Sequence, residues 1–266
     1  INVDQLIKAH QGKYKLPSKP VLITVDDGYQ SFYQHVYPIV RAKNIPIVLA
    51  VVGSWLQPKA NQKVDFAGES IERNKILSWG ELKEMQQSGL VEIASHSYHL
   101  HQGIIANPQG NLEPAAISRI YHPHSKSYES DADYQARIYQ DLKKNNDLLK
   151  EHGIRSPRVM VWPYGRYNMQ LIQTAKQLGM PITITLDDGA DHAKQSLQNM
   201  SRILVQGNMT TSALAQEIKS RELNFNDNNR PQKIMHVDLD YIYDPNPEQQ
   251  ERNLGILLDR INGMGV

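Results

Sequence analysis

Four apolar segments of the chain are each followed by side chains that can bind a metal ion or move a proton. These groups are, in chain order, Asp26-Asp27, Ser95-His96-Ser97-Tyr98-His99-Leu100-His101, Pro163-Tyr164-Gly165 and Asp187-Asp188-Gly189. The apolar segments are short and rich in β-branched residues, which predicts buried strands. Because open α/β sheets and α/β barrels place their chemistry at the carboxyl ends of strands, these four groups are the candidate site.

Two imidazoles and one carboxylate form a common ligand set for a divalent metal ion, with positions left open for water and substrate. Metal binding lowers the pKa of water from 15.7 to about 7, so a second carboxylate can act as the base. Plainer interpretations remain open: an Asp-Asp pair can cap a turn or accept a phosphoryl group in receiver domains, and three nearby histidines can lie in a solvated loop.

Predicted strands and helices alternate over most of the chain, which indicates a parallel α/β barrel or a doubly wound sheet. The predicted strands are 19–25, 45–52, 90–94, 158–162, 181–186, 201–205 and 233–243. The predicted helices are 3–10, 31–43, 78–89, 131–152, 168–178, 210–221 and 248–262. The polar segments 57–74 and 102–130 are predicted to be long loops, which in a compact domain are usually functional or mobile.

Composition excludes several classes of protein. The chain has 29 basic and 28 acidic residues and no long basic block, so we expect no nucleic-acid partner. No apolar run approaches the roughly 18–20 residues that span a bilayer. With no cysteine, any metal ion must be bound by His, Asp or Glu. The start Ile1-Asn2-Val3-Asp4 contains no signal peptide and no Met, so we expect a processed or excised chain.

In combination, these motifs resemble the polysaccharide deacetylases of carbohydrate esterase family four. The similarity is greatest to the branch that N-deacetylates poly-β-1,6-N-acetyl-D-glucosamine in biofilms. It is carried by 20–33 (PVLITVDDGYQSFY), 94–104 (ASHSYHLHQGI), 161–165 (VWPYG) and 234–244 (IMHVDLDYIYD). The resemblance extends in order over nearly the whole chain. It implies an α/β fold, a distorted (β/α) barrel of about seven strands, here incomplete at the N-terminus.

The resemblance also implies a metal-dependent hydrolase and a role for each matching residue. Asp26 is then the general base, the metal ligands are Asp27, His96 and His101, and the acetyl pocket is lined by Pro163 and Tyr164. The ion is zinc, nickel, cobalt or iron, which the ligand types alone do not distinguish. Because this branch separates its two ligand histidines by five residues, we expect His99 to be a loop or rim residue.

Two departures from the family pattern bear on activity. Many members have an arginine just before the proline of the third motif, where it orients the base, whereas this chain has Val161 and Trp162. Arg202 is a candidate substitute, but we expect it to be an ordinary surface residue. The general-acid histidine of this branch lies on an N-terminal strand before the equivalent of Ile1. We therefore expect the chain to bind metal but to deacetylate poorly by itself.

Residues 1–230 are predicted to form the deacetylase domain, and 231–266 to begin a second, C-terminal (β/α) barrel after a polar linker at 224–230. Asp238-Leu239-Asp240 also resembles the nucleophile motif of haloacid-dehalogenase-type phosphatases, but too few residues follow to build that fold. By resemblance, the partners are the polymer and the C-terminal domain of the same protein. The full-length protein is then periplasmic or on the cell surface, with a lipid anchor in the outer membrane.

Two other classes of function remain as alternatives. A glycoside hydrolase with paired carboxylates would need no metal and would release shorter chains. A non-catalytic polysaccharide-binding module would keep its affinity for polymer after Asp26→Asn or chelation. Trp55, Trp79 and Trp162 are candidates to stack on sugar rings, although we expect at least one to be a core residue.

Overall fold

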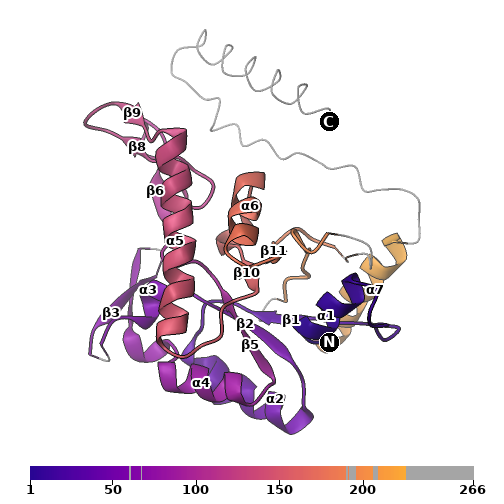
Figure 1. Cartoon of the computed structure of the whole chain (residues 1–266). Helices are drawn as coiled ribbons and strands as arrows, with labels where there is room; N and C mark the ends of the chain where they lie inside the picture. The colour runs from indigo at the N-terminus through magenta and orange to yellow at the C-terminus, as the bar shows by residue number, and fades with distance from the viewer. Residues whose placement is uncertain (60, 67, 190, 192–195, 206–208, 226–266) are drawn as a thin grey trace. The chain divides into compact units, whose positions relative to one another are not determined.

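The computed structural model describes residues 1–225, except 60, 67, 190, 192–195 and 206–208 (Figure 1). Contacts divide the chain into two compact units, Ile1–Glu222 and Leu223–Val266, and the described fold is that of the first. The predicted strand 233–243, the predicted helix 248–262 and the predicted second domain lie outside the described residues. The division into domains at 230 therefore stays a prediction.

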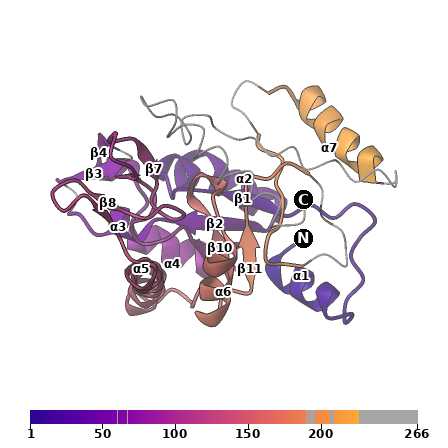
Figure 2. The same ribbon diagram turned by 90° about the horizontal axis from the view of Figure 1, so that it is seen from above.

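A five-stranded parallel sheet, curled into a half-barrel, organises this unit. Its order is β1 (Ile23–Val25), β2 (Ile47–Val51), β5 (Val91–Ser95), β10 (Val159–Val161) and β11 (Ile182–Ile184). Because all five strands run in the same direction, their carboxyl ends meet at one edge (Figure 2). The prediction of an α/β fold of the distorted-barrel type is confirmed.

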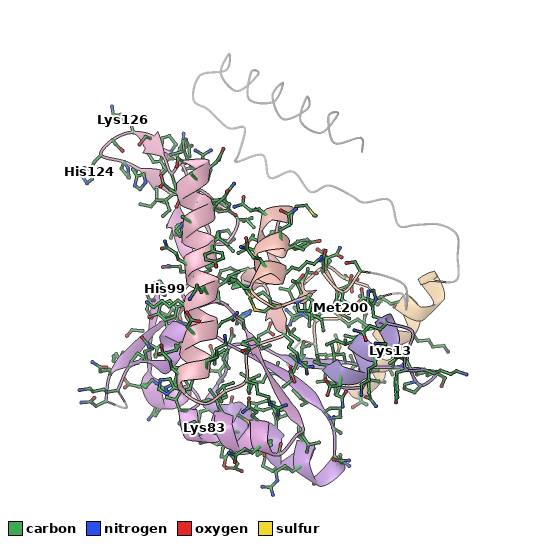
Figure 3. All side chains as sticks on the ribbon, in the orientation of Figure 1. Lys13, Lys83, His99, His124, Lys126 and Met200 are labelled. Atoms are coloured by element: carbon green, nitrogen blue, oxygen red, sulfur yellow. The ribbon has the colours of Figure 1, made fainter. Side chains whose placement is uncertain are left out.

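The predicted strand at 201–205 is wrong. Residues 197–202 do run along β11, and backbone hydrogen bonds join Thr183, Thr185 and Asp187 to them. These bonds are irregular, and only Met200, labelled in Figure 3, forms a parallel bridge, to Ile184. The apolar sequence predicted a regular strand, but it did not show that the backbone hydrogen bonds between this segment and β11 would be interrupted.

All six helices predicted within the described residues are present. They are α1 (Val3–His10), α2 (Tyr37–Lys43), α4 (Trp79–Gln87), α5 (Asp131–Glu151), α6 (Met169–Gln177) and α7 (Thr211–Phe225). The Ser78–Glu81 capping box starts α4 as predicted, with Ser78 N–H donating to Glu81 Oε2 at 2.8 Å. Residues Phe32–Val36 form a π-helical turn before α2, next to Pro38, which has no N–H to donate and disfavours an α-helical turn there.

The two segments predicted as loops contain short hairpins instead. These are β3 (Lys63–Phe66) with β4 (Glu69–Glu72), β6 (Gly103–Ile105) with β7 (Leu112–Pro114), and β8 (Tyr121–His122) with β9 (Ser127–Tyr128). Strands of two to four largely exposed residues have too little alternation to be recognised in the sequence. The tip of the β8–β9 hairpin, with His124 and Lys126, projects from the sheet beyond the start of α5 (Figure 3).

Both faces of the sheet are buried, which explains the nearly uninterrupted apolar strands. Val3 and Leu6 of α1 pack on one face against Val48, Ala50 and Ala94. Helices α2 and α4 cover the other face at β1, β2 and β5, below these strands in Figure 1, and α5 and α6 pack near β10.

An arginine at the start of β10 ties α1 to the amino ends of the strands. Arg158 Nε lies 2.9 Å from Glu92 Oε1, and its Nη1 lies 2.6 Å from Asp4 Oδ1. The carboxyl ends of the strands, at the opposite edge of the sheet, are not covered by this contact, and the candidate site lies there.

Two of the three tryptophans are core residues, because Trp55 is 2% and Trp162 is 0% exposed. Neither can stack on a sugar as it stands. Trp79 instead stacks in parallel on His152, with 3.8 Å between ring centroids. Among the described residues, no helix is both long and apolar enough to cross a membrane.

Candidate metal centre

A left-handed turn separates the two carboxylates that follow β1. Asp27 and Gly28 have φ angles of 74° and 76°, and Gly28 N–H donates to Asp26 O at 2.9 Å. A Cβ on Gly28 would lie 3.0 Å from Val51 Cγ1, so glycine is needed both for the angle and for the close approach to β2. The turn directs Asp27 towards two histidines and Asp26 towards an arginine.

Asp27, His96 and His101 come together at the carboxyl ends of β1 and β5. Asp27 Oδ1 lies 3.5 Å from His96 Nε2 and 3.5 Å from His101 Nε2. The ligand atoms of the three residues all lie within 4.8 Å of one another, and no second cluster of this kind occurs in the described part of the chain. His96 Nδ1 lies 2.7 Å from Val161 O. A proton on Nδ1 would donate to that carbonyl and leave the Nε2 lone pair for a ligand bond.

The electrostatics of the three residues fit a divalent metal ion. Burial raises the pKa of Asp27, and burial lowers the pKa of both His96 and His101, so the imidazoles stay neutral and able to bind a metal. Asp27 Oδ1 is buried without a hydrogen-bond donor among the described residues. A buried carboxylate oxygen is costly without a partner, and a cation between it and the two Nε2 atoms would supply one.

Arg202 binds the second carboxylate, so the expectation of an ordinary surface arginine is wrong. Its Nη1 lies 2.9 Å from both Asp26 Oδ1 and Asp26 Oδ2, and its side chain is only 13% exposed. Its Nε donates to Thr185 O at 2.8 Å, which anchors the guanidinium on the residue that follows β11. Arg202 and Asp26 are 176 positions apart in the chain, which hides this pair from a sequence pattern.

Pro163 and Tyr164 lie beside the triad in a short 3₁₀ turn after β10. The Tyr164 ring centroid is 4.5 Å from that of His101, and Tyr164 has a left-handed φ of 58°. Two further aromatic rings pack on His101: Trp55, which was a candidate for sugar stacking, at 5.1 Å, and Phe66 of the β3–β4 hairpin, which was not predicted at the site, at 5.7 Å. Apolar rings around a ligand histidine limit the access of water.

The other singled-out residues lie outside the triad. His99 is exposed next to α5, and its Nδ1 lies 3.3 Å from Ser54 Oγ (Figure 3). Asp187 accepts a hydrogen bond from the Tyr167 hydroxyl at 2.7 Å, and Asp188 forms a two-bond ion pair with Arg221.

The loop between the two histidines of the cluster is held by α5. Asp141 Oδ1 accepts the Tyr98 backbone N–H at 2.8 Å, and Asp141 Oδ2 accepts the His99 N–H at 2.9 Å. One helical turn further, Asn145 Nδ2 donates to Ser95 Oγ at 2.7 Å. Burial raises the pKa of Asp141 to about 6, although the two N–H donors favour its charged form.

Comparison with known proteins agrees with this fold and site. The model of the polysaccharide deacetylase family matches residues 13–183, and a model described as hypothetical glycosyl hydrolase family 13 matches 236–266. The chain belongs to the polysaccharide deacetylase family. The poly-beta-1,6-N-acetyl-D-glucosamine N-deacetylase of Escherichia coli K12 is 39% identical over all 266 residues, which span 39% of that protein's length.

Solved structures extend the comparison. The deacetylase domain of BpsB from Bordetella bronchiseptica is 44% identical, with a TM-score of 0.74 over 77% of this chain and 78% of that one. A de-N-acetylase from Aggregatibacter actinomycetemcomitans is 37% identical, with a TM-score of 0.76 over 82% of each chain. The N-deacetylase of Staphylococcus aureus N315 is more distant, at 24% identity over 74% of this chain and 58% of that protein.

Replacement of one candidate ligand is expected to weaken divalent-metal binding strongly. Loss of a residue that only supports a metal ligand lowers metal affinity by roughly 10–100-fold. His101→Ala removes one of the three candidate ligands themselves, so the affinity for the metal ion should fall by more than that. Isothermal titration with Zn²⁺ measures it. His99→Ala, only two residues away, is the matched control and should bind as the wild type does. Equal affinity of the two variants would contradict the assignment of His101.

Asp141 should make the protein less stable as pH rises. Because its pKa rises from 3.8 unfolded to about 6 folded, the folded state binds the proton more readily. The resulting stabilisation is complete below pH 4 and is lost as pH rises through 6, by about 3 kcal/mol. Urea unfolding from pH 4 to pH 7 should show that Asp141→Asn lacks this decline relative to the wild type. Asp147→Asn, on the same helix but 43% exposed, is the control and should follow the wild-type profile.

Proposed function

We propose that this chain is the deacetylase part of a metal-dependent enzyme that removes N-acetyl groups from poly-β-1,6-N-acetyl-D-glucosamine. The observation that carries the proposal is the Asp27–His96–His101 cluster, with the separately oriented carboxylate of Asp26 beside it. The names of the relatives from Escherichia coli and Staphylococcus aureus support this polymer as the substrate. The chain spans only part of those proteins.

Asp27, His96 and His101 would hold the metal ion, with zinc, nickel, cobalt and iron as the candidates. A divalent ion supplies a Lewis acid that polarises a carbonyl and lowers the pKa of water. Neutral imidazoles and a carboxylate are suitable ligands for all four metals.

The chain's own residues then supply proton transfer and orientation. Asp26 takes the proton from the water that attacks the acetamide carbonyl, and Arg202 holds both Asp26 oxygens in place. Pro163 and Tyr164 line the acetyl pocket, and the Tyr164 backbone N–H donates to the developing oxyanion. The carbon–nitrogen bond breaks, and the products are acetate and a free amine. A histidine from a segment before Ile1 protonates the leaving nitrogen.

The whole protein extends this function. We propose that 231–266 begins a second (β/α) barrel, which the match of 236–266 to a glycosyl hydrolase family model supports. The polymer and that C-terminal domain are the proposed partners. The periplasm, with attachment to the outer membrane, is the location proposed from the Escherichia coli relative.

Acetate release from a β-1,6-linked N-acetylglucosamine oligomer tests the proposed function. We expect release that a chelator stops and added divalent metal restores, slow for this chain and faster when preceding residues are included. Asp26→Asn should reduce the rate by about 10²–10⁴-fold, because it removes the general base. Asp188→Asn is the control carboxylate outside the site and should keep the wild-type rate.

Other outcomes of this assay would overturn the proposal. Shorter chains without acetate, in the presence of chelator, would indicate a glycoside hydrolase. Polymer binding that survives Asp26→Asn and chelation, with no acetate from the extended chain, would indicate a binding module.

Exchange of the arginine that holds the base should slow catalysis without weakening the metal site. Arg202→Lys keeps the charge but loses the planar group that contacts both Asp26 oxygens and Thr185. We expect kcat to fall about 10-fold, the equivalent of one charge-assisted hydrogen bond, at unchanged Zn²⁺ affinity. Arg221→Lys disrupts a comparable two-bond pair with Asp188 away from the site and serves as the control. An unchanged kcat for Arg202→Lys would contradict the role of Arg202.

A further inference from the structure

The segment between the two ligand histidines is an irregular loop that depends on other parts of the chain for its shape. Ser97 has a left-handed φ of 70°, which a non-glycine residue adopts only when its surroundings enforce it. Within the loop, Ser97 Oγ accepts the Leu100 N–H at 3.0 Å. This single internal bond does not account for the polar backbone groups of residues 97–99.

Two helices supply the missing partners. At the start of α3 (Gly53–Leu56), Gly53 N–H donates to Ser97 O at 3.1 Å and Ser54 N–H donates to Tyr98 O at 2.9 Å. The successive N–H groups of Tyr98 and His99 donate to the two oxygens of Asp141 on α5. The carbonyls of Ser97 and Tyr98 are thus held by α3 and the amides of Tyr98 and His99 by α5. The His99 carbonyl accepts a hydrogen bond from Gln102 Nε2 at 3.0 Å.

The chemistry of position 141 is specific to a carboxylate. Two neighbouring N–H donors need two acceptors, and a carboxylate has two oxygens at the right spacing. An asparagine has one oxygen, and its NH₂ group would face the second N–H donor. Burial raises the pKa of Asp141 to about 6, so the charge is unfavourable for folding at neutral pH. A residue that only filled this space would not need to be charged.

Asn145 adds a second attachment on the same face of α5, four residues along. It binds Ser95, the residue before His96, and its side chain is 0% exposed. Helix α5 therefore holds the chain on both sides of His96. Asn145 binds Ser95 just before it, and Asp141 binds Tyr98 and His99 after it, where His99 precedes His101 by two residues.

We propose that Asp141 is a positioning residue of the metal centre. Asp141 accepts hydrogen bonds from the N–H groups of Tyr98 and His99. In this way it fixes His101 relative to His96 and thereby sets the affinity of the site for a divalent ion. This inference rests on the proposed function, because it assigns a role within the same site.

Cobalt titration of the full chain, followed by visible absorption, tests the proposal. Asp141→Asn should bind Co²⁺ about 10-fold more weakly, the lower end for loss of an outer-shell partner, with a shifted absorption band from the altered ligand geometry. Its melting temperature at pH 7 should not fall. Asp147→Asn lies on the same helix and pairs with Lys143 rather than with the loop, so it should match the wild type.

Metal dependence of acetate release separates a positioning role from a purely structural one. In Asp141→Asn, excess Co²⁺ should restore most of the rate, because the weakened site can still be filled. Wild-type Co²⁺ affinity in this variant, or a loss of rate that excess metal does not restore, would overturn the proposal and leave the proposed function standing. Absence of Co²⁺ binding and of acetate release in the wild type would overturn both.

Discussion

The turn after β1 places two adjacent carboxylates in different environments, and the rest of the site depends on this separation. The backbone of Asp27 is in the left-handed conformation, and Gly28 allows the chain to pass close to Val51 of the next strand. Without this turn, neighbouring acidic side chains would repel each other and compete for the same partners. With it, one carboxylate contacts two neutral imidazoles and the other contacts a guanidinium. The candidate ligand Asp27 and the proposed base Asp26 are thus adjacent in sequence but lie in electrostatically distinct surroundings.

The parallel sheet makes this arrangement possible because it brings distant segments to one edge. Asp27 follows β1, His96 and His101 follow β5, and Tyr164 follows β10. Val161, the last residue of β10, also supplies the carbonyl that contacts His96 Nδ1, so a core strand helps to fix a candidate ligand. The aromatic rings that surround His101 come from α3, from the β3–β4 hairpin and from the turn after β10, which belong to three different parts of the chain.

The sequence was sufficient for the features that depend on local pattern. Apolar runs predicted the five strands of the sheet, and capping residues such as Ser78 and Glu81 predicted where helices begin. The resemblance selected Asp27, His96 and His101, which the structure brings together. Contacts made only in the folded chain could not be settled from spacing: Arg202 was a candidate that we expected to be an ordinary surface residue, and Asp141 was not singled out. Arg202 reaches Asp26 across the barrel, and Asp141 reaches a loop more than forty residues away. The short hairpins were missed because their exposed strands carry no apolar alternation.

The position of Arg202 also determines where this domain ends in functional terms. The family model matches residues up to 183, yet the guanidinium that contacts Asp26 belongs to Arg202 and is anchored by Thr185, the residue that follows β11. A fragment trimmed to the recognisable family region would keep all three candidate ligands but lose the guanidinium that contacts Asp26, the proposed base. The region that the family model recognises and the region that completes the proposed site therefore have different boundaries, because the segment that follows β11 supplies the arginine that contacts Asp26.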